Sequence, residues 1–127
     1  MVVAYDEDKV LILQEKCEVT AFEVMCGGPP CVDPEVRAIR MFAWFGVSAR
    51  VIAVLLNLMI LYTPLVEHVE AIDEQTKALL IFLSMLTQGL STKELLCRFH
   101  LTDKKHLRRV VSMMMQCCEE LESMVLV

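Results

Sequence analysis

The chain has 127 residues, the length of a single domain; 56% of them are hydrophobic and 23% are charged. This apolar content excludes an intrinsically disordered chain, and four Gly and four Pro without an internal repeat exclude collagen-like and solenoid architectures. The net charge of −5 does not favour a dominant nucleic-acid surface. The charge is uneven, because residues 1–36 carry eight acids and two bases, whereas residues 91–109 carry six bases and two acids.

Residues 7–25 are predicted to form an amphipathic helix, because apolar residues recur there every three or four positions. This stripe consists of Val10, Leu13, Cys17, Ala21 and Val24. The sequence CGGPPC at residues 26–31 interrupts the helix, since Gly and Pro both break regular structure. Asp33 then caps the next helix, with Pro34 at its first position.

The most apolar stretch is residues 41–66, in which Arg50 is the single charge. Its uncharged part, residues 51–66, has 16 residues, whereas a membrane-spanning helix needs about 20. We therefore predict a central helix that the rest of the domain buries on all sides, with membrane association as the alternative. Pro64 marks a kink or the start of a new helix.

The carboxyl-terminal half is also predicted to be helical. Four acids between residues 67 and 74 indicate a solvated segment, and residues 77–87 form a second very apolar helix that Gly89 ends. Ser91 and Glu94 have the spacing of a capping box and open a short helix to about residue 99.

The last predicted helix spans residues 105–124, with Thr102 or Asp103 as its cap. Its buried stripe is Leu107, Val110, Val111, Met114, Cys118, Leu121 and Val125. No segment alternates with a period of two residues, so the chain is predicted to be one all-α domain over residues 1–127, with six or seven helices.

The six cysteines show no C-x-x-C pair and no neighbouring His at zinc spacing. We interpret them as small, buried, reduced hydrophobic residues of an intracellular chain. The sequence also lacks a Gly-rich phosphate loop and a Ser/His/Asp signature. We therefore expect no catalytic residue, no cofactor and no metal.

Residues 49–56, ARVIAVLL, resemble the Gly-Arg-Ile-Val-Ala-Leu part of the first homology motif of Bcl-2 family apoptosis regulators. Residues 68–75, HVEAIDEQ, are similar to the end of the central helix and the following turn in Mcl-type members. Val47 and Ser48 stand where the family has Asn-Trp, and short, divergent members are typical of virus-encoded copies. The resemblance implies a Bcl-2-like bundle around a central hydrophobic helix.

This resemblance implies an apoptosis inhibitor that holds amphipathic death-ligand helices of pro-apoptotic proteins in a hydrophobic groove. Arg50 would pair with an Asp of the ligand helix. The candidate groove-lining residues are Phe42, Phe45, Val47, Val51 and Val54. The implied location is cytoplasmic, with association with the mitochondrial outer membrane of the host cell, and homodimerisation and peripheral membrane contact stay open. If residues 77–87 form the central helix instead, Arg50 loses this role.

An alternative function follows from residues 78–110, which resemble the three-helix core of helix-turn-helix DNA-binding proteins. His100 replaces the usual tight-turn Gly, and Leu101 and Leu107 are six apart where the family usually has five. The candidate nucleic-acid contacts are Lys93, Lys104, Lys105, Arg108 and Arg109, with Arg98 and His106 beside them. A third interpretation is a helical module whose apolar surface is covered by another subunit.

Overall fold

The computed structural model describes residues 4–125. Seven helices follow one another in this part of the chain, and no strand occurs within it. They are α1 (Glu7–Cys26), α2 (Pro34–Phe45), α3 (Ala49–Tyr62), α4 (Leu65–His68), α5 (Ile72–Gln88), α6 (Thr92–Arg98) and α7 (Lys104–Val125). The prediction of an all-α fold with six or seven helices is confirmed for the described residues.

Several helices begin and end where the sequence predicts. The Asp33 carboxylate accepts a hydrogen bond at 2.9 Å from the backbone N–H two residues further on, and Pro34 follows it at the first helical position. The Ser91 hydroxyl accepts the backbone N–H of Glu94 at 3.2 Å and lies 3.1 Å from its carboxylate. Gly89 ends α5 with a left-handed φ of 62°. These local signals act without help from tertiary contacts, which is why sequence alone locates them.

The prediction of one helix across residues 41–66 is wrong. Gly46 ends α2 with a φ of 76°, and the Ser48 hydroxyl accepts the backbone N–H of Val51 at 3.2 Å to begin α3. The two helices are bent by 56° at this break. A glycine that stops one helix and a serine that caps the next therefore outweigh the apolar composition around them.

The break also bears on the membrane alternative. Within residues 4–125, no single helix is long and apolar enough to cross a membrane. The bent pair of α2 and α3 meets the criterion together, by length and composition alone.

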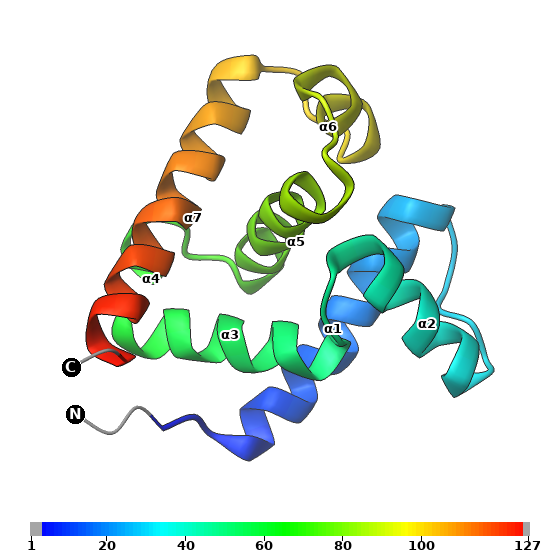
Figure 1. The fold of residues 1–127 in the computed structure, drawn as a ribbon, viewed down its shortest axis with the longest axis horizontal. Helices are drawn as coiled ribbons and strands as arrows, with labels where there is room; N and C mark the ends of the chain where they lie inside the picture. Colours follow the sequence, from blue (N-terminus) through cyan, green and yellow to red (C-terminus); the bar gives the residue numbers. More distant parts are fainter. Residues whose placement is uncertain (1–3, 126–127) are drawn as a thin grey trace.

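The central helix is α5. It packs against α1, α2, α3 and α7, and Figure 1 shows α7 on one side of it and α1 and α2 on the other. Residues 78–82 are all buried, and five consecutive residues make more than one helical turn. α3 instead buries one face, while Val51 and Leu61 on it are about half exposed. The alternative with residues 77–87 as the central helix therefore describes this fold.

The amino-terminal helix joins α3 and α2 through both polar and aromatic contacts. The backbone N–H of Asp6 donates to the side-chain oxygen of the buried Asn57 at 3.0 Å, which links the start of α1 to α3. Toward α2, the rings of Phe22 and Trp44 meet edge to face with their centroids 4.9 Å apart. These contacts hold α1 against α2 and α3.

The predicted buried stripes of the two longest helices are largely confirmed. In α1 the buried members are Val10, Leu13, Cys17 and Ala21, and Val24 is half-buried. In α7 they are Leu107, Val110, Met114 and Leu121, while Val111 and Cys118 are half-buried and Cys117 is buried in addition. The side chain of Val125 lies outside the described residues.

The prediction that the cysteines are buried holds for part of the set. Cys17 and Cys117 are buried, Cys31 and Cys118 are half-buried, and Cys26 and Cys97 are exposed. All six thiols are free. The exposed pair lies at the last residue of α1 and on the short α6, so position in the fold outweighs residue type.

Candidate nucleic-acid interface

The turn between α6 and α7 is built around His100. This residue has a φ of 55°, the single positive φ outside glycine among the described residues. The backbone N–H of His100 donates to the Cys97 carbonyl at 3.4 Å, and the N–H of Leu101 donates to the Leu96 carbonyl at 2.8 Å. This pair of bonds is the Schellman motif that ends helices at a left-handed residue. His100 therefore takes the backbone conformation of the glycine that it replaces.

The second departure from the helix-turn-helix pattern is accommodated in the same turn. Asp103 begins α7, because its carboxylate accepts the backbone N–H of Lys105 at 2.8 Å. The extra residue between Leu101 and Leu107 thus lies in the turn, before α7 starts at Lys104. The register of α7 against the core is unaffected, because Leu107 is buried.

α5, α6 and α7 share an apolar core behind this turn. Leu95 and Phe99 are buried beneath α6, and Leu107 and Val110 are buried beneath α7. α7 packs against both α5 and α6, and Figure 1 shows α6 near the amino-terminal end of α7. The three helices therefore form a packed unit in which one side of α7 stays open.

The basic residues named by the sequence lie on that open side. Lys93, Lys104, Lys105, Arg108 and Arg109 are all exposed. The four on α7 occupy helical positions away from the buried residues of the same helix, and no acid occurs in α7 before Glu119. Ion pairs among residues 4–125 involve other cations, on α1, α2 and α3. We call Lys104, Lys105, Arg108, Arg109 and Ser112 the α7 face.

Two grooves flank the α7 face. The groove toward α5 and α6 has a volume of about 300 Å³ and is mostly apolar, with Leu95, Leu107 and Val111 among its walls. The groove toward α4 has a volume of about 490 Å³ and is lined by His68, Val69, His106, Arg109, Val110, Ser112, Met113 and Gln116. Ser112 lines both, so the α7 face forms a ridge between them.

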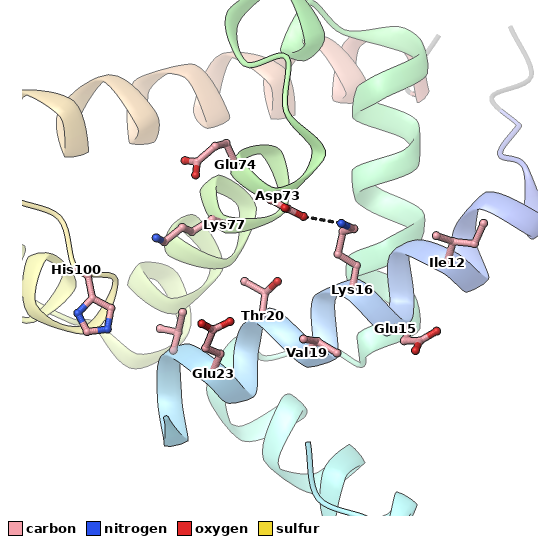
Figure 2. Close-up of a pocket in the computed structure, with 11 residues that line it drawn as sticks. Ile12, Glu15, Lys16, Val19, Thr20, Glu23, Asp73, Glu74, Lys77 and His100 are labelled. Carbon is pink, nitrogen blue, oxygen red and sulfur yellow. Dashed lines mark hydrogen bonds and ion pairs between the residues drawn. The ribbon is translucent and has the colours of Figure 1, made fainter. Parts of the chain in front are cut away.

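A larger groove of about 570 Å³ lies elsewhere, between α1 and α5 (Figure 2). Its walls carry the carboxylates of Glu15, Glu23, Asp73 and Glu74, and Lys16 pairs with Asp73 at 2.5 Å. Figure 2 shows His100 at one end of it. Its charges are mixed and mainly negative, and it contains none of the five basic candidate residues.

The residues assigned to a partner-helix groove are spread over the junction of α2 and α3. Phe45 is buried in the core, Val47 and Val54 are half-buried, and Phe42 and Val51 are exposed. None of the five lines the three grooves described above. Exposed apolar residues instead follow the outer side of α2, where Val36, Ile39 and Phe42 are 38%, 63% and 60% exposed.

Arg50 is engaged within the chain. Its two terminal nitrogens lie 2.7 and 2.8 Å from the two carboxylate oxygens of Glu7, and it donates a longer hydrogen bond of 3.5 Å to the Tyr5 hydroxyl. The hydrogen bond to Arg50 lowers the pKa of Glu7, and the same bond raises the pKa of Arg50. A ligand carboxylate would therefore have to compete with Glu7 for this guanidinium.

Two groups of functional interest could not be found in the sequence. Glu7 and Arg50 are far apart in the chain, and no pattern links them. His68 reaches the groove only through the packing of α4 on α7, and nothing in the sequence predicts that packing. Among residues 4–125, no group of three His, Cys, Asp or Glu side chains is arranged to hold a metal ion.

No protein-family model, curated protein or solved structure that was compared with this chain matches it.

Proposed function

We propose that this chain binds double-stranded DNA through the α7 face, with α7 as the recognition helix. The observation that carries the proposal is the exposed set of Lys and Arg residues at the start of α7, none of which has an acidic partner in residues 4–125. Such groups make the phosphate and base contacts of DNA-binding helices. The left-handed turn at His100 supports it, because α6 and α7 follow one another across a short turn, as the two helices of a helix-turn-helix motif do.

The shape of the face favours duplex DNA over duplex RNA. A helix about 10–12 Å in diameter fits the major groove of B-form DNA, which is about 12 Å wide. The major groove of A-form RNA is deep and narrow, so side chains of a helix do not reach its bases. Lys93, at the start of α6, then contacts the backbone, as the first helix of the motif does.

Fluorescence anisotropy with a labelled duplex of about 24 base pairs, roughly two helical turns, tests the proposal. We expect a Kd of about 1–100 µM near physiological salt for a duplex of arbitrary sequence, and tighter binding in about 50 mM salt. Arg108→Ala and Lys104→Ala should each weaken binding and reduce the slope of log K against log salt by about 0.9. Lys9→Ala, which removes an exposed lysine on α1, is the matched control and should leave the slope unchanged.

Absence of duplex binding in about 50 mM salt would overturn this proposal. Equal weakening by Lys9→Ala and Arg108→Ala would also overturn it, because the attraction would then depend on overall charge. Tighter binding of an RNA duplex than of the DNA duplex would contradict α7 as a major-groove helix.

A second candidate function, a Bcl-2-like inhibitor that binds amphipathic helices of pro-apoptotic proteins, is favoured by one observation. Val36, Ile39 and Phe42 present large apolar surfaces to solvent along α2, which suits a helix that docks through its apolar face. Titration with a panel of such peptides should give binding at micromolar concentration, and Phe42→Ala should weaken it, because Phe42 is 60% exposed on the apolar side of α2. With α5 as the central helix Arg50 has no assigned role in this binding, so Arg50→Ala should leave it unchanged.

A further inference from the structure

The groove between α4 and α7 is rich in hydrogen-bond donors. Five of its eight lining residues carry side chains that can donate hydrogen bonds, namely His68, His106, Arg109, Ser112 and Gln116. No carboxylate lines it, whereas four line the groove between α1 and α5. Its remaining walls are apolar, from Val69, Val110 and Met113. A concave surface with donors and without carboxylates suits an anion.

The groove is continuous with the α7 face, because Arg109 and Ser112 belong to both. Its α7 residues recur along one side of the helix from His106 to Gln116, a distance of about 15 Å at 1.5 Å per residue. Its opposite wall is supplied by α4 and the residue after it, through His68 and Val69. The groove therefore runs beside the ridge that the proposed function places in the major groove.

We infer that this groove is a phosphate-binding site and that it receives a backbone phosphate of the DNA held by α7. This inference rests on the proposed function for the source of the phosphate. The Arg109 guanidinium supplies a permanent charge and a forked set of donors, which matches phosphate geometry. His68 and His106 add donors from two sides, and each gains a positive charge when it is protonated.

Several charged groups surround the two imidazoles. His68 and His106 also line a neighbouring cavity, whose walls include Glu74 and Lys77 of α5. Glu67 precedes His68 on α4, Glu70 follows Val69, and on α7 the Gln116 amide donates to the Glu120 carboxylate at 3.4 Å. Gln116 is therefore engaged by Glu120, and the groove offers a ligand the donors of His68, His106, Arg109 and Ser112.

The test uses His68→Ala, which lies outside both helices of the helix-turn-helix unit. His68 is exposed, so its loss should leave the fold intact, which a circular dichroism melt can verify. Val66→Ala is the matched control, because Val66 is an exposed residue of the same short helix and does not line the groove. Each variant is titrated with the DNA duplex, and separately with inorganic phosphate while the imidazole NMR signals are followed.

We expect His68→Ala to weaken duplex binding about tenfold, the effect of losing one hydrogen bond to a charged group. Val66→Ala should bind like the unmodified chain. Inorganic phosphate should shift the His68 and His106 signals. If the duplex does not bind but phosphate shifts these signals, the groove is a phosphate-binding site whose ligand is free phosphate. The proposed DNA binding is then overturned.

The opposite pattern separates the two proposals. If Arg108→Ala weakens duplex binding but His68→Ala and Val66→Ala do not, the groove is no phosphate site and the proposed function stands. If neither the duplex nor phosphate binds, both proposals are overturned. His106→Ala serves as a second variant. If both His68→Ala and His106→Ala bind the duplex with unchanged affinity, the inference is likewise refuted.

Discussion

Replacing Gly46 by alanine tests why the apolar stretch breaks between α2 and α3. The residue has a φ of 76°, which costs an L-residue about 1–2 kcal/mol. The added Cβ would lie 2.7 Å from the Thr87 hydroxyl oxygen and 3.3 Å from its methyl carbon. Relief by movement of the backbone is limited, because the Gln88 side chain donates to the Trp44 carbonyl at 3.1 Å and ties α2 to α5.

Overpacking of this kind adds about 1–3 kcal/mol, so Gly46→Ala should lower the free energy of unfolding by about 2–5 kcal/mol in total. Urea unfolding followed by circular dichroism measures this loss. Gly89→Ala is the matched control, because Gly89 has a φ of 62° and its added Cβ meets nothing within 4 Å. That substitution should cost about 1–2 kcal/mol, the conformational part alone.

The double variant Gly46→Ala/Thr87→Ala isolates the contact. Removal of the Thr87 hydroxyl and methyl groups should return the cost of the alanine to that of Gly89→Ala. If Gly46→Ala costs no more than Gly89→Ala, or if Thr87→Ala gives no relief, the approach of α2 to α5 does not constrain this position.

Three further predictions concern other parts of the chain. Arg50 holds the pKa of Glu7 below its usual value. The stabilisation by this pair should therefore be complete above about pH 4.3, the pKa of Glu in the unfolded chain, and should vanish as the pH falls through the lower pKa of the folded chain. The difference in Tm between the unmodified chain and Glu7→Gln should then shrink toward zero from pH 7 to pH 2. Burial raises the pKa of Cys17 to about 12, so a thiol reagent at neutral pH should modify the exposed Cys97 and spare Cys17 until the chain unfolds; early labelling of Cys17 would contradict its burial. Ser91→Ala should lower stability by about 1 kcal/mol in urea unfolding through loss of the α6 cap, and an unchanged midpoint would show that the cap contributes nothing.

Helix boundaries that depend on residues close together in the sequence could be predicted from the sequence. Asp33 with Pro34, and Ser91 with Glu94, carry their capping partners within three positions, so their helices begin where expected. The break at Gly46 was missed, although a glycine followed by a serine is itself a local signal. Apolar composition over residues 41–66 dominated the prediction, and composition does not distinguish one long helix from two.

Features that depend on packing between distant segments could not be predicted. The candidate basic residues of α7 are exposed, which follows from the sequence because the spacing of Leu107 and Val110 fixes the buried side of the helix. The groove beside them requires His68, which only the packing of α4 on α7 brings there. The pairing of Arg50 with Glu7 likewise depends on how α1 crosses α3.

The all-round burial of α5 has a consequence for motion. A helix with one solvent face can release its amide protons by local opening, but residues 78–82 have no such face. Their amide hydrogens should exchange with solvent only when the whole domain opens, so their exchange rates report the free energy of global unfolding. The amide hydrogens of α2, which buries only Met41 and Phe45, should exchange earlier. Amide exchange should thus be slow in the central helix α5 and faster in the outer helix α2.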